Sequence, residues 1–301
     1  MAVAPEACKD IERIGYNMAG QLFLCATPIG NLNDMTPRVV ETLREVDLIA
    51  AEDTRNSIKL LNHFQINTPM TSYHEYNKVE KAETLISKMK SGVNVALITD
   101  AGTPAISDPG EVLVRMCHEQ GVVVTSLPGA AACITALTLS GLSTRRFSFE
   151  GFLPADKKEK KQVLEELTRE MRTIILYEAP HHLKRTLQEL YDTLGQRKIT
   201  LCRELTKKFE SVMPTTLEEA ILYYEQNEPR GEYVLVLEGK SRESAVAEER
   251  AVWDEMTVEE HMAFYEKDGM DHKNAMKQVA KDRGVTKRDI YQYLIGKSVD
   301  K

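Results

Sequence analysis

The hydrophobic positions in the first half of the chain form short apolar runs separated by amphipathic segments of helix length. The runs occupy residues 22–26, 48–51, 93–98 and 122–126. This alternation is typical of parallel strands joined by helical crossovers. Thr36-Pro37 and Asp108-Pro109 each place a capping side chain before a proline, which predicts that helices begin there. The pattern predicts an α/β domain of four strands over residues 21–141.

A second α/β unit is predicted over residues 142–240. An amphipathic helix ending at Gly195 lies between its strands. The polar segment 241–252 is expected to be a linker that is helical in part, and residues 1–20 a tail without a motif. The four predicted strands of this unit occupy residues 147–152, 173–177, 199–202 and 233–237.

Residues 253–301 predict a compact helical module. Thr257 with Glu260 and Thr286 with Asp289 have capping-box spacing. The module resembles a helix-turn-helix, with mixed charges, so a role in packing or oligomerisation and a role in RNA contact both stay open. The predicted helices span residues 257–267, 271–283 and 286–295.

Composition excludes several classes of protein. Thirty-nine Lys and Arg against 46 Asp and Glu give a net charge of −7, which excludes a globally basic nucleic-acid binder. No apolar window approaches the ~18–20 residues of a spanning helix, and charges interrupt the first twenty positions, so we expect neither a membrane nor a secreted protein. The 5 cysteines are far apart and lack a C-x-x-C pair. We therefore expect a cytoplasmic protein with no disulfide framework and no metal site.

Four loops at the expected carboxyl ends of the first-domain strands have unusual compositions. Ligand sites of open α/β sheets lie at this edge, and the third loop is longer than a simple connection needs. The loops are poor in Lys and Arg, and the chain has no P-loop, G-x-S-x-G or H-E-x-x-H motif, which disfavours phosphate-rich ligands and hydrolases. They favour a cofactor with amide, hydroxyl and sulfonium groups, although each loop alone also fits an ordinary turn. The loops are 27–32, 51–55, 99–110 and 127–132.

Seven ordered strings resemble the tetrapyrrole-methylase-like family, in its branch that methylates ribosomal RNA of the small subunit. The resemblance covers residues 21–239, and GVTKRDIYQYL (284–294) resembles the helical module at the end of that branch. The strings are TPIGNLNDMTPR (27–38), DLIAAEDTR (47–55), TDAGTPAISDPG (99–110), LPGAAACITAL (127–137), FEGFLP (149–154), YEAPHHL (177–183) and RELTKKFE (203–210).

The resemblance implies a two-domain α/β fold with S-adenosyl-L-methionine in the cleft between the domains, usually in a homodimer. It implies methylation of the ribose 2′-hydroxyl of a cytidine in the decoding region of 16S rRNA, within the small ribosomal subunit. The family's cofactor contacts match positions in the first, third and fourth loops and in the second domain. These positions are Pro28, Gly30, Asn31, Asp100, Gly102, Thr103, Ile106, Pro128, Gly129, Ala130, Tyr177 and Tyr233.

A ribose hydroxyl is a weak nucleophile, so a general base is expected to contribute ~10²–10⁴ in rate. Asp53, His74 and Glu178 lie near predicted strand ends, with Arg55 as a partner for a phosphate or carboxylate. Glu178 ranks first because it follows a second-domain strand. An acid that stabilises a helix N-terminus is an equal alternative for Glu178.

An acidic protein that acts on RNA needs local basic patches. We expect phosphate contacts from clusters that follow FEGFLP or flank the cleft, although a solvated helix face is their ordinary role. A methylase acting on a tetrapyrrole or a translation factor, and an RNA-binding assembly protein that keeps the cofactor fold, are the alternatives. The basic residues are Lys157, Lys158, Lys160, Lys161, Arg145, Arg146, Lys207, Lys208, Lys287 and Arg288.

Overall fold

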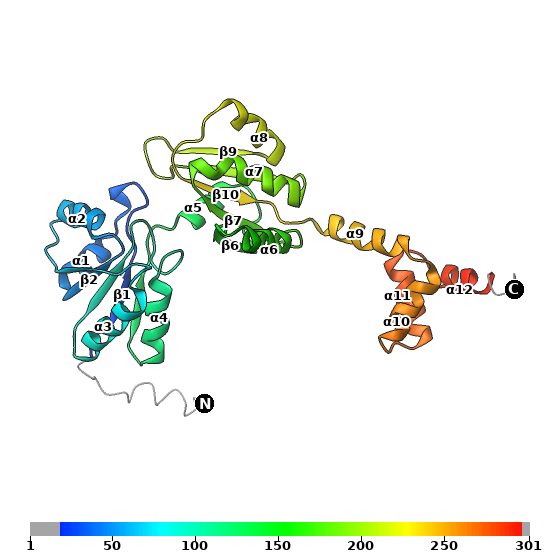
Figure 1. The fold of residues 1–301 in the computed structure, drawn as a ribbon, viewed down its shortest axis with the longest axis horizontal. Coiled ribbons are helices and arrows are strands. Elements are labelled where there is room, and N and C mark those ends of the chain that lie inside the picture. The colour runs from blue at the N-terminus through cyan, green and yellow to red at the C-terminus, as the bar shows by residue number, and fades with distance from the viewer. Residues whose placement is uncertain (1–18, 297–301) are drawn as a thin grey trace, which may run out of the picture.

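The computed structural model describes residues 19–296, which form two α/β units followed by a helical module (Figure 1). The first unit is a parallel five-stranded sheet in the order β3-β2-β4-β1-β5. The edge strand β3 is an addition to the four strands that the sequence predicts. The strands are β1 (Leu22–Cys25), β2 (Leu48–Ala51), β3 (Met70–Ser72), β4 (Val95–Ile98) and β5 (Val124–Leu127).

Helices cover both faces of this sheet, so its strands are buried on each side. The Thr36 and Asp53 side chains cap α1 and α2, and a short 3-10 helix (Leu32–Asp34) precedes α1. The helix starts after 36 and near 109 confirm the predictions from the Thr-Pro and Asp-Pro pairs. The helices are α1 (Pro37–Glu45), α2 (Thr54–His63), α3 (Lys78–Lys90) and α4 (Gly110–Glu119).

The second sheet has the order β6-β7-β10-β8-β9, with β6 parallel to β7 and the other pairs antiparallel. Strand β9, which contains Pro214, is again an edge strand beyond the four predicted ones. The strands are β6 (Phe147–Phe152), β7 (Thr173–Glu178), β8 (Lys198–Arg203), β9 (Ser211–Thr216) and β10 (Tyr233–Leu237).

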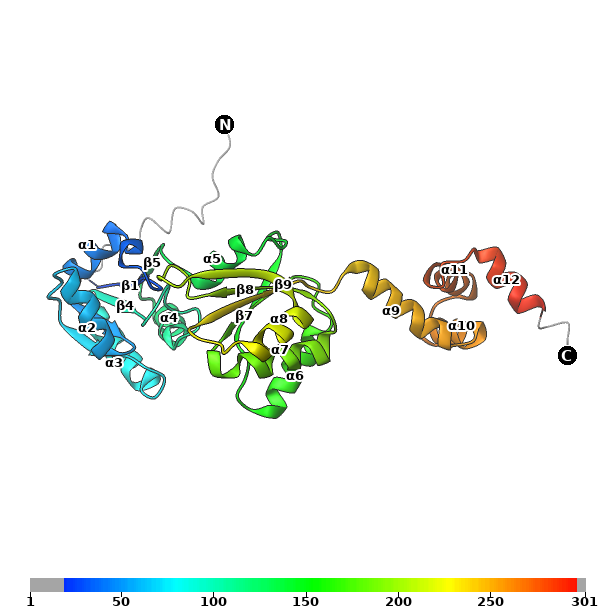
Figure 2. The ribbon, with the colours of Figure 1, turned by 90° about the horizontal axis from the view of Figure 1, so that it is seen from above.

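The two faces of the second sheet are covered by different helices (Figure 2). Helices α6 (Lys157–Leu167), α7 (Pro180–Leu194) and α8 (Leu217–Gln226) pack on one face. Helix α5 (Ala132–Leu139) packs on the other, through Cys133 and Ala136. The sequence places α5 in the 21–141 unit, whereas its packing joins it to the second sheet.

The C-terminal module has its own core, which includes Met262, Met276 and Ile290. In both views it lies apart from the sheets at the end of α9 (Figures 1 and 2). The expected linker is largely helical, because α9 (Arg242–Glu255) spans it. The module's other helices lie close to their predicted bounds, at α10 (Val258–Lys267), α11 (His272–Asp282) and α12 (Lys287–Gly296).

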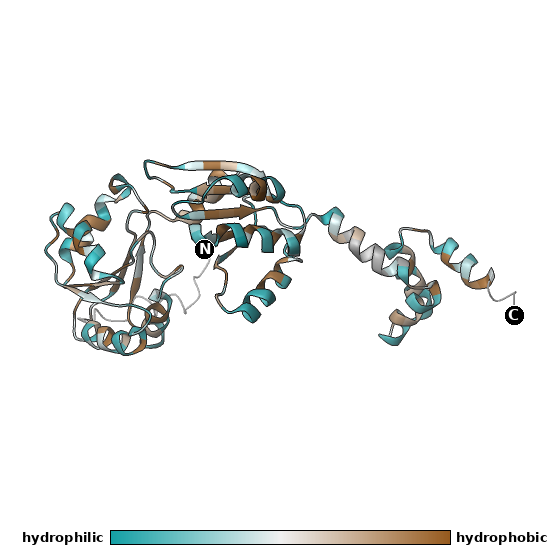
Figure 3. Cartoon of the chain, turned by 45° about the horizontal axis from the view of Figure 1, so that its top comes forward, coloured by the Kyte–Doolittle hydropathy of each residue, from teal (hydrophilic) through white to brown (hydrophobic). Residues whose placement is uncertain are grey.

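Hydropathy follows this architecture, since the strands of both sheets are mostly hydrophobic and the helices carry hydrophilic outer turns (Figure 3). Over the residues that the structure describes, no helix has the length and apolar character needed to cross a membrane. Cys8 and the expected tail lie largely outside the described residues. Cys25, Cys117, Cys133 and Cys202 are buried free thiols.

Candidate active site

A cavity of about 330 Å³ lies between the two α/β units. Its first-domain wall is the long loop after β4, which includes Asp100, Gly102 and Asp108. Its second-domain wall consists of the ends of β7, β8 and β10. The cavity therefore occupies the carboxyl edge of the parallel sheet, where ligands of such folds bind.

Backbone contacts hold the long loop against its neighbours. Thr27 and Gly102 exchange backbone hydrogen bonds of 2.9 and 3.1 Å, and the Thr103 hydroxyl donates to the Ala130 carbonyl at 2.9 Å. Gly102 has a φ of 87°, and a Cβ there would lie 3.2 Å from Ile29 Cγ2. Ala105 also has a positive φ, of 65°. Strained backbone of this kind is typical of functional loops.

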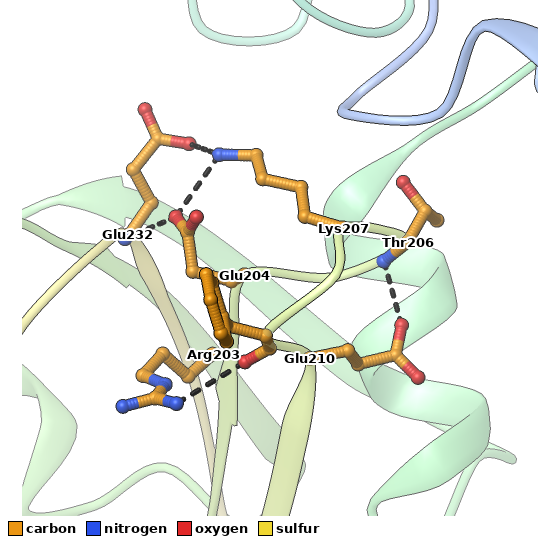
Figure 4. A network of polar contacts seen from close by, with 7 residues as sticks. Arg203, Glu204, Thr206, Lys207, Glu210 and Glu232 are labelled. Atoms are coloured by element: carbon orange, nitrogen blue, oxygen red, sulfur yellow. Dashed lines mark hydrogen bonds and ion pairs between the residues drawn. The ribbon is translucent and has the colours of Figure 1, made fainter.

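The loop after β8 forms the opposite wall and is held by charged hydrogen bonds (Figure 4). Lys207 Nζ lies 3.0 Å from Glu204 Oε1 and 2.8 Å from Glu232 Oε2. The Glu232 N–H also donates to Glu204 at 2.9 Å, and the Thr206 N–H donates to Glu210 at 2.6 Å. This network holds two carboxylates and one ammonium at the cavity.

Both partners of the Glu204–Lys207 pair keep their charges. Burial alone raises the pKa of Glu204, but the Glu232 N–H and Lys207 lower it below its ordinary value. Burial alone lowers the pKa of Lys207, but the hydrogen bonds that it donates to Glu232 and Glu204 raise that pKa above its ordinary value. Lys207 is therefore a fixed cation at neutral pH and no proton acceptor.

Strand register decides which second-domain side chains face the cavity. Tyr177, Val234 and Cys202 are paired across β7, β10 and β8. Side chains that are paired in this way share one face of the sheet, and here that is the face that α5 and the cavity occupy. The next row, Glu178, Tyr233 and Arg203, points to the opposite face, toward α7 and α8.

Apolar groups line much of the cavity. Phe152 and Ile106 line it with exposures of 58% and 41%, and the rings of Phe152 and Phe149 lie edge-on to Tyr177, with centroids 5.5 and 5.0 Å apart. Burial raises the pKa of the Tyr177 phenol above its usual range, and that of the Cys202 thiol to about 11. Both groups are therefore neutral hydrogen-bonding groups at pH 7.

The structure brings half of the predicted cofactor residues to the cavity wall. These are Asp100, Gly102, Thr103, Ile106, Tyr177 and Tyr233. The Tyr233 hydroxyl, however, accepts from Arg230 N at 3.2 Å and from Tyr224 at 3.3 Å on the far face of the sheet. Tyr233 can therefore contact a ligand in the cavity only through atoms close to its backbone.

The other half does not line the cavity. Gly30 packs against the Lys207 stem, where a Cβ would lie 2.3 Å from Cγ, and Gly129 packs against Ala26. Ala130 accepts the Thr103 hydroxyl, and the Asn31 side chain accepts the Asn33 N–H. Pro28 and Pro128 do not line the cavity. These residues shape the loops that line it.

Of the four predicted catalytic residues, Glu178 alone lines the cavity. Its side chain is 6% exposed, and its two carboxylate oxygens accept from the Ala179 N–H at 2.8 Å and from the Thr186 hydroxyl. These contacts also suit an acid that holds the start of α7. The role of Glu178 as the base stays a prediction.

Asp53, Arg55 and His74 lie away from the cavity wall. The Arg55 guanidinium lowers the pKa of Asp53 to about 2, which makes that carboxylate a weak base. The His74 N–H donates to Asn77 Oδ1 at 2.9 Å. Asp53 reaches the site indirectly, because its N–H donates to Asp100 Oδ1 at 3.3 Å.

Sequence reasoning missed Glu204, Glu232, Asp108 and Phe152 as wall residues. The string RELTKKFE contains Glu204 and Lys207, but its spacing does not show that Glu232, 28 residues further on, completes the network. Lys160 also differs from its expected phosphate contact, because it is buried and pairs with both Glu189 oxygens at 2.8 and 2.9 Å.

Comparisons with known proteins agree with this architecture. Residues 21–221 match the family model of Tetrapyrrole (Corrin/Porphyrin) Methylases. The chain is 48% identical over 274 residues to Ribosomal RNA small subunit methyltransferase I of Synechocystis sp., covering 91% of this chain and 96% of that protein. It is 47% identical over 277 residues to the protein of the same name from Bacillus subtilis, covering 92% and 94%.

A solved uroporphyrin-III C-methyltransferase of Thermus thermophilus, complexed with S-adenyl homocysteine, shares the fold. Its TM-score is 0.52 at 18% identity, covering 73% of this chain and 97% of that one. The predicted two-domain fold is confirmed. The chain therefore belongs to the tetrapyrrole (corrin/porphyrin) methylase family and is a methyltransferase, as its ordered motifs predict.

Proposed function

We propose that this protein transfers a methyl group from S-adenosylmethionine to the ribose 2′-hydroxyl of a cytidine in the decoding region of 16S rRNA. The observation that carries the proposal is the identity of 48% over almost the full length of a relative named for ribosomal RNA of the small subunit. The homodimer, the assembled small subunit as substrate and a cytoplasmic location belong to the same proposal.

The residues of the cavity fit this cofactor. Pockets of about 300–1,000 Å³ hold ligands of this size, and the cavity has about 330 Å³. Phe152 and Ile106 offer apolar contact to an aromatic base, and Gly102, which lines the cavity without a side chain, allows a ligand to approach its backbone closely. Asp100 offers a carboxylate to hydroxyl or amino groups. Tyr177 offers a neutral hydroxyl.

When bound, S-adenosylmethionine supplies an electrophilic methyl group on a sulfonium. The protein's part is to align the ribose oxygen with that carbon and to exclude water. Phe152 and Tyr177 restrict water on the second-domain side, while the Gly102 loop closes the first-domain side. The fixed charges of Glu204 and Lys207 require no rearrangement as charge moves during transfer.

The ribose hydroxyl must lose its proton as the new carbon–oxygen bond forms. Glu178 is the proposed acceptor, because it is the predicted acid that contributes to the cavity wall. In the structure its carboxylate is directed to Thr186 on the far face, so this role requires the side chain to turn toward the cavity. A carboxylate offers about four lone-pair positions, of which Ala179 and Thr186 occupy one on each oxygen.

Exposed lysines beside the cavity are the proposed contacts to RNA phosphates. Lys157 and Lys158 are exposed at the start of α6, and Lys208 is exposed beside Phe209. Lys160 and Lys207 are excluded from this set because carboxylates already hold them.

Tritiated methyl transfer to three acceptors tests the proposal: unmodified small ribosomal subunits, deproteinised 16S RNA and a tetrapyrrole precursor. Label at one cytidine of the RNA, resistant to alkaline cleavage, is the expected result. Label in the tetrapyrrole, or in neither RNA while the cofactor binds, contradicts the proposed substrate. A Gly102→Val variant, whose side chain would crowd Ile29, is the control that should lose cofactor binding.

A further inference from the structure

A second cavity, of about 410 Å³, lies on the α8 side of the second sheet. Arg203 and Arg230 line it together with Tyr223, over an apolar floor that includes Leu201 and Met213. Neither the family resemblance nor the cofactor accounts for it, because the cofactor cavity lies on the opposite face. We infer that this pocket binds a backbone phosphate of the substrate RNA, with the adjoining base against Tyr223.

The two arginines are available for an anion. Arg203 Nη2 donates to the Phe209 carbonyl at 3.2 Å, but its Nε is buried without a partner. Within residues 19–296 the Arg230 guanidinium has no side-chain or backbone acceptor. A buried donor without an acceptor costs free energy, and a phosphate oxygen would satisfy it.

The charge balance of the pocket favours the same ligand. Its one carboxylate, Glu228, is paired with Lys184 at 2.7 Å. The positive charges of Arg203 and Arg230 are therefore not neutralised inside the pocket. Paired arginines recognise phosphate because the guanidinium presents its donors in a fork.

Tyr223 makes RNA a better ligand than a free anion. Its ring is 48% exposed and stands perpendicular to Tyr224, with the centroids 4.9 Å apart, so the ring is held in place while part of it faces solvent. A rigid aromatic ring beside a basic groove is the usual platform for a base of single-stranded nucleic acid.

The position of the pocket connects it with the cofactor cavity. Arg203 immediately precedes Glu204, and Arg230 lies two residues before Glu232, both of which line the cofactor cavity. Two residues of extended chain span at most about 7 Å. Figure 4 shows the Arg203 guanidinium turned away from the Lys207 contacts. A single RNA strand that crosses this edge of the sheet can therefore reach both cavities.

The inference rests on the proposed RNA substrate, and its test separates the two. Affinity for unmodified small subunits is measured over a series of KCl concentrations, with full-length protein saturated with S-adenosylhomocysteine. Arg230→Ala is expected to weaken binding about tenfold and to reduce the slope of log affinity against log salt by about one. Arg169→Ala is the matched control, because Arg169 is exposed in the same domain but precedes β7 at the opposite edge of the sheet.

Wild-type protein that does not bind the subunits overturns both proposals. If the wild type binds the subunits and Arg230→Ala binds them as tightly as Arg169→Ala, the result overturns the proposed phosphate pocket but not the proposed RNA substrate. A photoreactive phenylalanine in place of Tyr223 identifies the neighbour directly. We expect it to cross-link to 16S rRNA, and a cross-link to a ribosomal protein would contradict the inference.

Discussion

Gly30 allows a contact between the two α/β units that can be tested by one added methyl group. A Cβ on Gly30 would lie 2.3 Å from Lys207 Cγ, whereas carbon atoms in contact keep about 3.5–4.0 Å. The Lys207 stem must therefore move by more than about 1 Å. Cγ is close to the backbone, so rotation of the distal side chain cannot relieve the overlap.

The displacement takes Lys207 Nζ away from Glu204 and Glu232, which now lie at 3.0 and 2.8 Å. The side chains of Lys207, Glu204 and Glu232 are 30%, 21% and 80% exposed, so solvent screens the pairs and their loss costs about 1–2 kcal/mol. The overlap itself costs a further 1–3 kcal/mol or so. Gly30→Ala should thus destabilise the protein by about 2–5 kcal/mol and weaken cofactor binding.

A double-mutant cycle isolates this contact. Lys207→Ala removes both Cγ and the ion pairs, so in that background Gly30→Ala should cost only its backbone strain and its contact with Thr206. The expected coupling is therefore the cost of the overlap and of the ion pairs together, about 2–5 kcal/mol. Any backbone cost of alanine at position 30 is the same in both backgrounds and cancels. The readouts are thermal unfolding and the dissociation constant of S-adenosylmethionine, with Lys208→Ala as the control. Additive effects of the two substitutions would refute the reasoning.

Three other predictions follow from the site. Glu178→Gln should lower kcat about 10²–10⁴-fold at a nearly unchanged melting temperature, because the amide oxygen can accept from Ala179 and the amide NH2 can donate to the Thr186 hydroxyl; unchanged turnover would leave Glu178 only its role at α7. The Asp53 pKa of about 2 lies below that of the unfolded chain, so its stabilising effect is present above about pH 4 and is lost as pH falls toward 2. Arg55→Met should return that pKa toward its ordinary value in a carbon-13 NMR titration, and an unmoved pKa would contradict this. A chain that ends at residue 240 should unfold at the temperature of the full protein's α/β units, since the module has its own core; a large drop in calorimetry would show that the module stabilises them.

The fold was largely predictable because its central strands are continuous apolar runs with capped helices between them. The two strands that the sequence did not reveal are both at sheet edges. Met70–Ser72 has three partly buried residues, and Ser211–Thr216 contains Pro214, which is tolerated at an edge but weakens a strand pattern. Both strands depend on pairing with a neighbour, which a local pattern does not contain.

The placement of α5 shows a second limit of sequence reasoning. Its small residues predict close packing, which the structure bears out, but Cys133 and Ala136 fit against either sheet equally well in a sequence. The contacts of α5 with β7 and β10 are set by the path of the chain after residue 127. The composition of a helix determines how closely it can pack, whereas the topology of the chain determines the sheet against which it packs.

For the candidate site, the sequence contains one further signal, which is the alternation of side chains between the two faces of a strand. Tyr177 and Glu178 are neighbours on one strand, so their side chains must lie on opposite faces of the sheet. A prediction that gives both of them to one cleft conflicts with that alternation. The backbone end of Glu178 can reach the cavity, while its carboxylate is directed to Thr186.

The same alternation explains how one sheet edge can serve two ligands. The row of Tyr177, Val234 and Cys202 lines the cofactor cavity, and the adjacent row ends in Arg203, which lines the second pocket. A slip of one residue in β8 would exchange these faces, placing a guanidinium among the apolar groups of the cofactor cavity and a thiol in the basic pocket. The contacts of the 203–210 loop with Glu232 oppose such a slip, because Lys207 and Glu204 both bond this residue, which directly precedes β10. The charged network in this loop therefore holds the strand register on which both cavities depend. This role explains why the loop has more ionic contacts than the two ligands require.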